Sequence, residues 1–133
     1  MPEFQLNTDN ADVNQFDEFT LGYIEAMFFA DIDTPDHDTE GLGIADLSSE
    51  AIAQIKTDCD KFQINNEGFL NSAYSSEYDE SRAGNDFYYT RVGHGTGFWD
   101  RGKGEIWDTL TKSSEGFGEI WAYQGDDGQI YIG

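Results

Sequence analysis

Apolar side chains recur at helical spacing near the start of the chain. Phe16, Phe19 and Tyr23 follow one another at intervals of three or four residues, as on one face of an α-helix. Asn14 precedes this run and is expected to be its N-cap, because short polar side chains accept hydrogen bonds from the first N–H groups of a helix. The pattern predicts a first helix over about residues 15–30.

A second line of four apolar side chains lies between Ile52 and Phe62. It predicts a helix that begins after Ser48 as N-cap. Residues 31–46, which separate the two helices, contain Pro and Gly and are expected to form a loop. A short third helix is predicted around residues 67–74.

The last part of the chain has a different pattern, typical of β-strands. Phe87 and Tyr89 would lie on one face of a strand, and Tyr88 and Thr90 on the other. Gly125-Asp126-Asp127-Gly128 is a hairpin-turn signal. In chain order we expect an exposed connection at 75–85, a strand at 86–92, a returning strand at 98–101, a helix at 105–112, and a hairpin of 119–124 with 129–132.

These elements predict an α+β fold, with N-terminal acidic helices packed on a C-terminal antiparallel sheet of about four strands. The chain of 133 residues has the size of one domain, residues 1–133, of which residues 1–13 are expected to be loosely held. Aromatic residues make up 15% of the chain, so a hydrophobic core is expected despite the charge.

The charge is the feature that most restricts function. The chain has 27 Asp and Glu against 7 Lys and Arg, a net charge of −20, and its first 55 residues contain no Lys or Arg. Residues 1–80 hold 19 of the acids and two lysines. Duplex nucleic acid and anionic lipid repel such a chain, so we expect it to bind neither nucleic acid directly nor a membrane. Simple solubility, or adaptation to high salt, is the alternative reading of the charge.

The location of the protein is also suggested by features that the sequence lacks. No apolar run reaches the roughly 18 residues of a membrane span. The N-terminus has no basic region typical of a secretion signal. The single cysteine, Cys59, cannot form an intrachain disulfide. We therefore expect a cytoplasmic protein.

Carboxylates of the N-terminal half form the first candidate site. Alternate residues of an extended segment point to the same side, roughly 6.6–7 Å apart, a spacing comparable to that of successive backbone phosphates. Such an array would engage the Lys and Arg side chains with which another protein holds nucleic acid. The predicted partner-binding residues are Asp17, Glu18, Glu25, Asp31, Asp33, Asp36, Asp38, Glu40, Glu50 and Asp58.

Clustered acids also suggest calcium, but the spacing does not fit. Counted from Asp31, the sixth residue is Asp36 and the twelfth is Leu42, where an EF-hand loop needs Gly and Glu. The possible zinc ligands, Cys59 and two histidines, are too few. We predict no metal and no cofactor.

The segment around the second histidine is the secondary candidate site. It gathers residue types suited to acid–base chemistry or anion binding. A purely structural hairpin is the alternative, with its arginines paired to Asp86 and Asp100 and the histidine at a loop tip. The candidate residues are Arg91, His94, Trp99, Asp100 and Arg101.

The run DFYYTRVGHGTGFWDRG at residues 86–102 resembles a motif, close to DFWLTRNGHGAGFWDR, of small acidic, mostly uncharacterised proteins of bacteriophages and related mobile elements. Similarity extends to residues 23–25, 58–62 and 123–131, and thus covers most of the chain after about residue 16. Val92 stands where the pattern has Asn, and Tyr88 and Tyr89 stand where it has Trp and Leu. The resemblance implies a phage origin and an intracellular setting.

These observations predict a phage-encoded inhibitor that mimics nucleic-acid charge and blocks a basic nucleic-acid-binding host protein, without catalysis. Two alternatives stay open. One is an acidic structural or adaptor protein, and the other is an enzyme or small-ligand binder that uses the segment around Arg91 and His94. The sequence leaves the oligomeric state undetermined.

Overall fold

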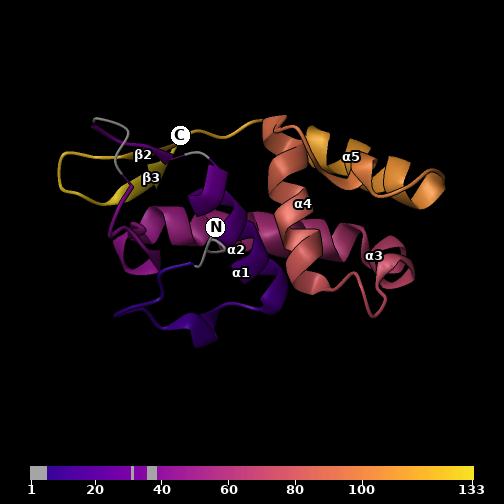
Figure 1. The fold of residues 1–133 in the computed structure, drawn as a ribbon, viewed down its shortest axis with the longest axis horizontal. Helices are drawn as coiled ribbons and strands as arrows, with labels where there is room; N and C mark the ends of the chain where they lie inside the picture. The colour runs from indigo at the N-terminus through magenta and orange to yellow at the C-terminus, as the bar shows by residue number, and fades with distance from the viewer. Residues whose placement is uncertain (1–5, 31, 36–38) are drawn as a thin grey trace.

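The computed structural model describes residues 6–30, 32–35 and 39–133 (Figure 1). Within them the fold is mostly helical, with a small sheet. The α-helices are α1 (Glu18–Ala30), α2 (Ser49–Asn65), α3 (Glu67–Ala73), α4 (Glu80–Val92) and α5 (Glu105–Gly116). The short 3-10 helices are η1 (Val13–Gln15), η3 (Ile44–Asp46) and η4 (Phe98–Asp100), and the strands are β1 (Ile32–Asp33), β2 (Ala122–Gln124) and β3 (Ile130–Ile132).

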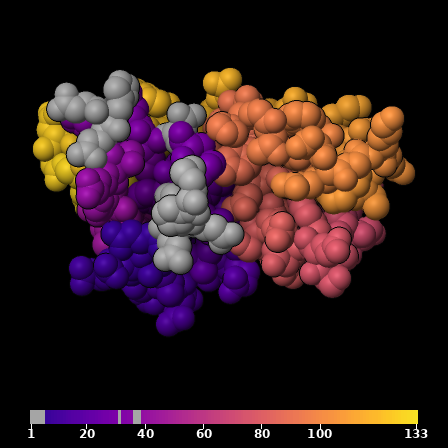
Figure 2. Space-filling model, viewed as in Figure 1, coloured from indigo at the N-terminus to yellow at the C-terminus, as the bar shows by residue number. Residues whose placement is uncertain are grey.

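Helix α2 runs along the long axis of the molecule, and α1 and α4 lie side by side across it (Figure 1). The sheet occupies one end of the long axis, while α3 and α5 form the other (Figures 1 and 2). The start of α2 is tied to the sheet, since the Ser48 N–H donates to the Ile130 carbonyl at 2.9 Å. Its far end leads into α3, which packs against α5. Helix α2 therefore links the two ends of the molecule.

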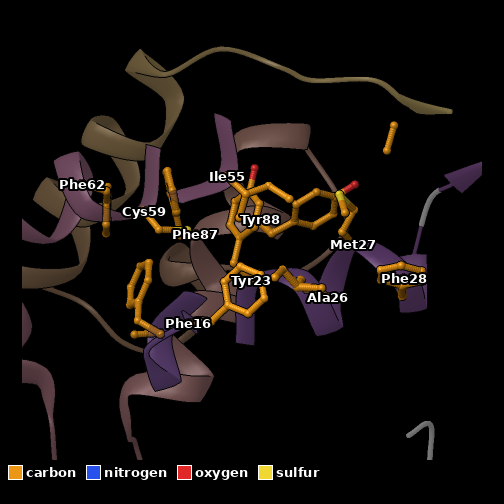
Figure 3. Close-up of a cluster of buried hydrophobic side chains, with 14 of the residues drawn as sticks. Phe16, Tyr23, Ala26, Met27, Phe28, Ile55, Cys59, Phe62, Phe87 and Tyr88 are labelled. Atoms are coloured by element: carbon orange, nitrogen blue, oxygen red, sulfur yellow. The ribbon is translucent and has the colours of Figure 1, made fainter. Parts of the chain in front are cut away.

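Aromatic rings from α1, α2 and α4 make up the centre of the core (Figure 3). Phe62 of α2 and Phe87 of α4 stack with ring centroids 4.2 Å apart. Phe19 of α1 stacks on Phe62 at 5.8 Å, and Tyr23 meets Tyr88 edge-on at 5.2 Å. These side chains are almost completely buried, so the aromatic share of the sequence indeed supplies a core.

Helices α1 and α4 are in backbone contact because each has a glycine at the crossing. A Cβ built on Gly22 would overlap the carbonyl oxygen of Ser81, and one built on Gly84 would overlap that of Phe19. The Asn85 side chain spans the same crossing and donates to the Gly22 carbonyl. The crossing therefore requires glycine at both positions.

Two of the predicted helix starts can be compared with the structure. Ser48 caps α2 as expected, with its Oγ accepting from the Ala51 N–H at 3.0 Å. The start of α1 lies three residues later than predicted, because Asp17 and not Asn14 caps it: the Thr20 N–H donates to Asp17 Oδ1 at 2.7 Å. The third helix, the helix that begins at Glu105 and the final hairpin are confirmed.

The predicted strand over residues 86–92 is wrong, because these residues form the second half of α4. Asp79 caps this helix, accepting from the Arg82 N–H at 2.9 Å. Phe87 and Tyr88 were assigned to opposite faces of the predicted strand, but both are buried. A strand with one face toward solvent would expose one of them. The expected exposed connection over residues 75–85 is correspondingly shorter, since α4 begins at Glu80.

The antiparallel sheet of about four strands is also wrong. Phe98–Asp100 forms η4 and not a returning strand, so only the final hairpin of the expected sheet is present among the described residues. In it Tyr123 lies opposite Tyr131. The strand order is β1-β2-β3, with β1 parallel to β2 and Ile32 opposite Ala122. Strand β1 lies in the segment expected to be a loop.

Candidate functional site

Arg91, a candidate for ligand binding, is buried in an internal ion pair. Its Nη1 lies 2.8 Å from Asp58 Oδ2 of α2 and 3.2 Å from the Tyr23 hydroxyl of α1. The remaining donors reach the chain after α5, where Nε meets the Gly118 carbonyl at 2.9 Å and Nη2 meets that of Phe117 at 3.0 Å. One guanidinium thus joins four segments of the fold.

Arg101 makes a second ion pair with a buried carboxylate, and its own side chain is 35% exposed. Its Nε and Nη2 lie 2.8 and 2.9 Å from the two oxygens of Asp86, which is completely buried. The Tyr78 hydroxyl donates to the same carboxylate at 2.6 Å. Of the two carboxylates that the structural reading paired with the arginines, Asp86 does bind an arginine, whereas Asp100 does not and Arg91 pairs with Asp58 instead.

The glycine–histidine loop has mainly local contacts. Gly93 ends α4 in the left-handed conformation, with φ of 70°, which glycine adopts at no steric cost. Thr90 Oγ1 accepts from the Phe98 N–H at 3.1 Å and closes the loop over the buried Phe98 ring. On the surface, His94 stacks on Tyr89 at 5.0 Å and Trp99 is 51% exposed.

The secondary candidate residues therefore do not converge on one site. Arg91 and Arg101 each face a buried carboxylate, while Asp100 is exposed and accepts from the Thr96 hydroxyl at 3.2 Å. Several residues of the segment 86–102, among them Asp86, Arg91 and Phe98, are buried in the fold. His94, Trp99 and Asp100 lie at the surface, and Arg101 is partly exposed there although its guanidinium is paired with Asp86.

The ten predicted partner-binding carboxylates differ in how far they are exposed to solvent. Glu18, Asp33, Glu40 and Glu50 are exposed, and Glu25 is half-buried beside Asn85. Asp58 is only 8% exposed and held by Arg91, so it cannot face a partner. Asp31, Asp36 and Asp38 lie outside the described residues.

Asp17 is exposed but has a structural task as well. Besides capping α1, it accepts from the Gln63 side chain at 3.1 Å. Partial burial alone would raise the pKa of Asp17, but the hydrogen bonds from Thr20 and Gln63 outweigh it and lower the pKa. The carboxylate is thereby kept ionised.

The exposed carboxylates are spread over more of the surface than the predicted set covers. Every described Asp and Glu is exposed except Glu25, Asp46, Asp58 and Asp86. The described residues include two ion pairs within 4.0 Å, those of Arg91 and Arg101. Both pairs are neutral, so the net charge of −20 belongs to the rest of the chain. Exposed acids outside the predicted set include Asp60, Glu67, Glu77, Asp79, Glu80, Glu105, Asp108, Glu115, Glu119, Asp126 and Asp127.

A row of aromatic side chains on the outer face of the sheet was also missed. Trp121 stacks on Tyr123 with centroids 4.5 Å apart, and Tyr123 stacks on Tyr131 at 5.9 Å. The Trp121 indole is 56% exposed, and its Nε1 donates to Asp33 at 3.3 Å. The signal was in the sequence: Trp121 and Tyr123 alternate along the predicted strand 119–124, which places them on one face.

Two buried tyrosines make the free energy of unfolding decrease with pH in the alkaline range. Burial raises the pKa of Tyr23, and burial together with Asp86 raises that of Tyr78. In the unfolded chain both ionise near pH 10. Above about pH 10 the unfolded state therefore binds fewer protons than the folded state, and stability that is fully present below this pH falls as the pH rises.

We accordingly expect cooperative alkaline unfolding. The measurement is a pH titration that follows tyrosinate absorbance and far-UV circular dichroism together. The last tyrosines should ionise only as the helical signal is lost. Ionisation of all seven tyrosines before any change in the helical signal would contradict this expectation.

Comparison with protein-family models, with curated proteins and with solved structures finds no match for this chain. Within the described part of the chain, three or more His, Cys, Asp or Glu side chains nowhere gather to hold a metal ion. None of the described helices is long and apolar enough to cross a membrane.

Proposed function

We propose that the protein is an acidic inhibitor that occupies the nucleic-acid-binding surface of a basic host protein. The uncompensated surface charge carries this proposal, because both described ion pairs use buried carboxylates and the exposed carboxylates have few cations of their own chain beside them. A basic surface that normally holds phosphates would supply the missing cations.

The proposal also agrees with the contacts that the two arginines of residues 86–102 make. Arg91 is buried, and the guanidinium of the more exposed Arg101 already binds the buried carboxylate of Asp86 through two nitrogens. The alternative of a small-ligand site on this segment therefore has little support. A phage protein acting in the cytoplasm of a bacterial cell agrees with the resemblance of residues 86–102 and with the proposed class of target.

The test uses the immobilised protein as bait in a bacterial lysate, washed at stepped salt. Partners held by exposed charges should elute well before 1 M salt, where the screening length falls to about 3 Å. The eluted proteins should be basic, and purified duplex DNA should displace them from the bait. Partners that stay bound at 1 M salt, or that DNA does not displace, would contradict charge mimicry.

Two variant baits separate charge from the motif loop. The triple variant Glu18→Gln, Glu40→Gln and Glu50→Gln removes three exposed charges and should release the partner at lower salt. The matched bait His94→Ala changes an exposed loop side chain and should elute as the wild type does. The reverse result would mean that the loop, and not the charge, is the binding surface.

A further inference from the structure

A hollow with aromatic and acidic walls lies beside the sheet. The chain after α5 runs back past the end of α4 to the sheet (Figure 1), and a hollow of about 480 Å³ lies along this path. Its apolar walls are Ile32 of β1, Tyr88 and Val92 of α4, and Trp121. Two carboxylates, Asp33 and Glu119, line it as well, and the described residues of its lining include no Lys or Arg.

The indole of Trp121 is fixed in position at the edge of this hollow. One of its faces is stacked on Tyr123, its Nε1 is held by Asp33, and more than half of the side chain is exposed. An electron-rich ring beside carboxylates attracts a cation, and indole attracts it most strongly among the aromatic side chains. Since Asp33 and Glu119 are both exposed, the hollow combines an apolar wall with two sites of negative charge.

We infer that this hollow receives an arginine side chain of the partner, with the guanidinium against Trp121 and within reach of the carboxylates of Asp33 and Glu119. The inference rests on the proposed function, and it adds the place where the basic protein docks. Arginine fits better than lysine, because its planar group stacks on a ring while its N–H fork binds carboxylates, and it is less strongly hydrated. Its apolar stem would lie along Ile32 and Val92.

The test uses two synthetic peptides of equal length and charge, one with spaced arginines and one with lysines at the same positions. Binding of the wild-type protein is measured by calorimetry at low salt, and the indole N–H signals of its three tryptophans are followed by NMR. The arginine peptide should bind more tightly than the lysine peptide. It should shift the Trp121 signal and leave that of Trp99 in place.

Variants supply matched controls for both parts of the hollow. Trp121→Ala should weaken binding of the arginine peptide about three- to thirtyfold, whereas Trp99→Ala, which removes an equally exposed indole, should not. The pair Asp33→Asn and Glu119→Gln should weaken binding more than Asp60→Asn and Glu77→Gln, which removes the same charge from exposed positions elsewhere.

The outcomes separate the inference from the proposed function. If the wild type binds the arginine peptide but the Trp121 signal does not move, or both charge variants lose equal affinity, the docking site is wrong and charge mimicry stands. If the wild type binds neither peptide, both are overturned. The NMR readout is made on the wild-type protein, so it decides the question even if Trp121→Ala fails to fold.

Discussion

Replacing Gly84 by Ala is expected to destabilise the fold by about 3 kcal/mol or more. The added methyl group would overlap the Phe19 carbonyl oxygen and lie 2.9 Å from the Tyr23 backbone nitrogen. Both atoms belong to the backbone of α1, so no side-chain rotation can relieve the overlap, and the two helices would have to separate. The free energy of unfolding, from urea denaturation followed by circular dichroism, measures the effect.

Gly68→Ala is the matched control for this substitution. Gly68 also lies in a helix, α3, but a Cβ built on it has no atom within 4 Å. Alanine loses less conformational entropy on folding than glycine, so this variant should be as stable as the wild type or more stable by about 0.5–1 kcal/mol. Equal midpoints for Gly84→Ala and the wild type would show that α1 and α4 do not cross as closely as described.

Arg91→Met is expected to cost about 3–5 kcal/mol of stability. Methionine keeps an apolar side chain at this position, but it removes the guanidinium that lies 5.6 Å from the ring centroids of Phe87 and Phe117 and leaves the Asp58 carboxylate buried without its cation. The Tyr23 hydroxyl and the carbonyls of Phe117 and Gly118 lose a donor at the same time. The unfolding free energy again provides the measurement.

A double-mutant cycle separates the ion pair from the rest of this loss. Asp58→Asn with Arg91→Met removes both charges, so it should cost clearly less than the sum of the two single variants. Lys112→Met, which removes an exposed cation of α5, should change stability by no more than about 0.5 kcal/mol. Additive single effects would mean that Asp58 and Arg91 do not depend on each other.

The elements that the sequence predicted correctly are those specified by neighbouring residues. The helix after Ser48 has its cap and its apolar line within one segment, and the final hairpin has its turn residues between two apolar runs. Helix α4 has a local cap, Asp79, but its buried residues do not form a single apolar line. It is surrounded by other elements, so Phe87 and Tyr88 are both buried, and the charged Asp86 and Arg91 are buried with them.

The candidate site was harder to predict for the same reason. Asp58 resembles any exposed acid of a helix until Arg91, 33 residues later, is seen to reach it. Likewise, the orientation of the exposed Trp121 indole depends on a hydrogen bond to Asp33, which lies 88 residues earlier. Exposed carboxylates could be expected from composition. Which two acids, Asp58 and Asp86, are buried as partners of arginines, and where the hollow beside Trp121 lies, result from contacts between distant segments.

The pairing of β1 with β2 has a consequence for the order in which the chain can fold during its synthesis. Ile32 and Asp33 are made early, but their partners Ala122 and Tyr123 follow 90 residues later. A nascent chain on the ribosome can already display the carboxylates of α1 and α2, yet it lacks Trp121 and the sheet that supports it. Nascent chains could thus attract basic proteins only through diffuse charge, and a specific docking surface would exist only after the last strands are added.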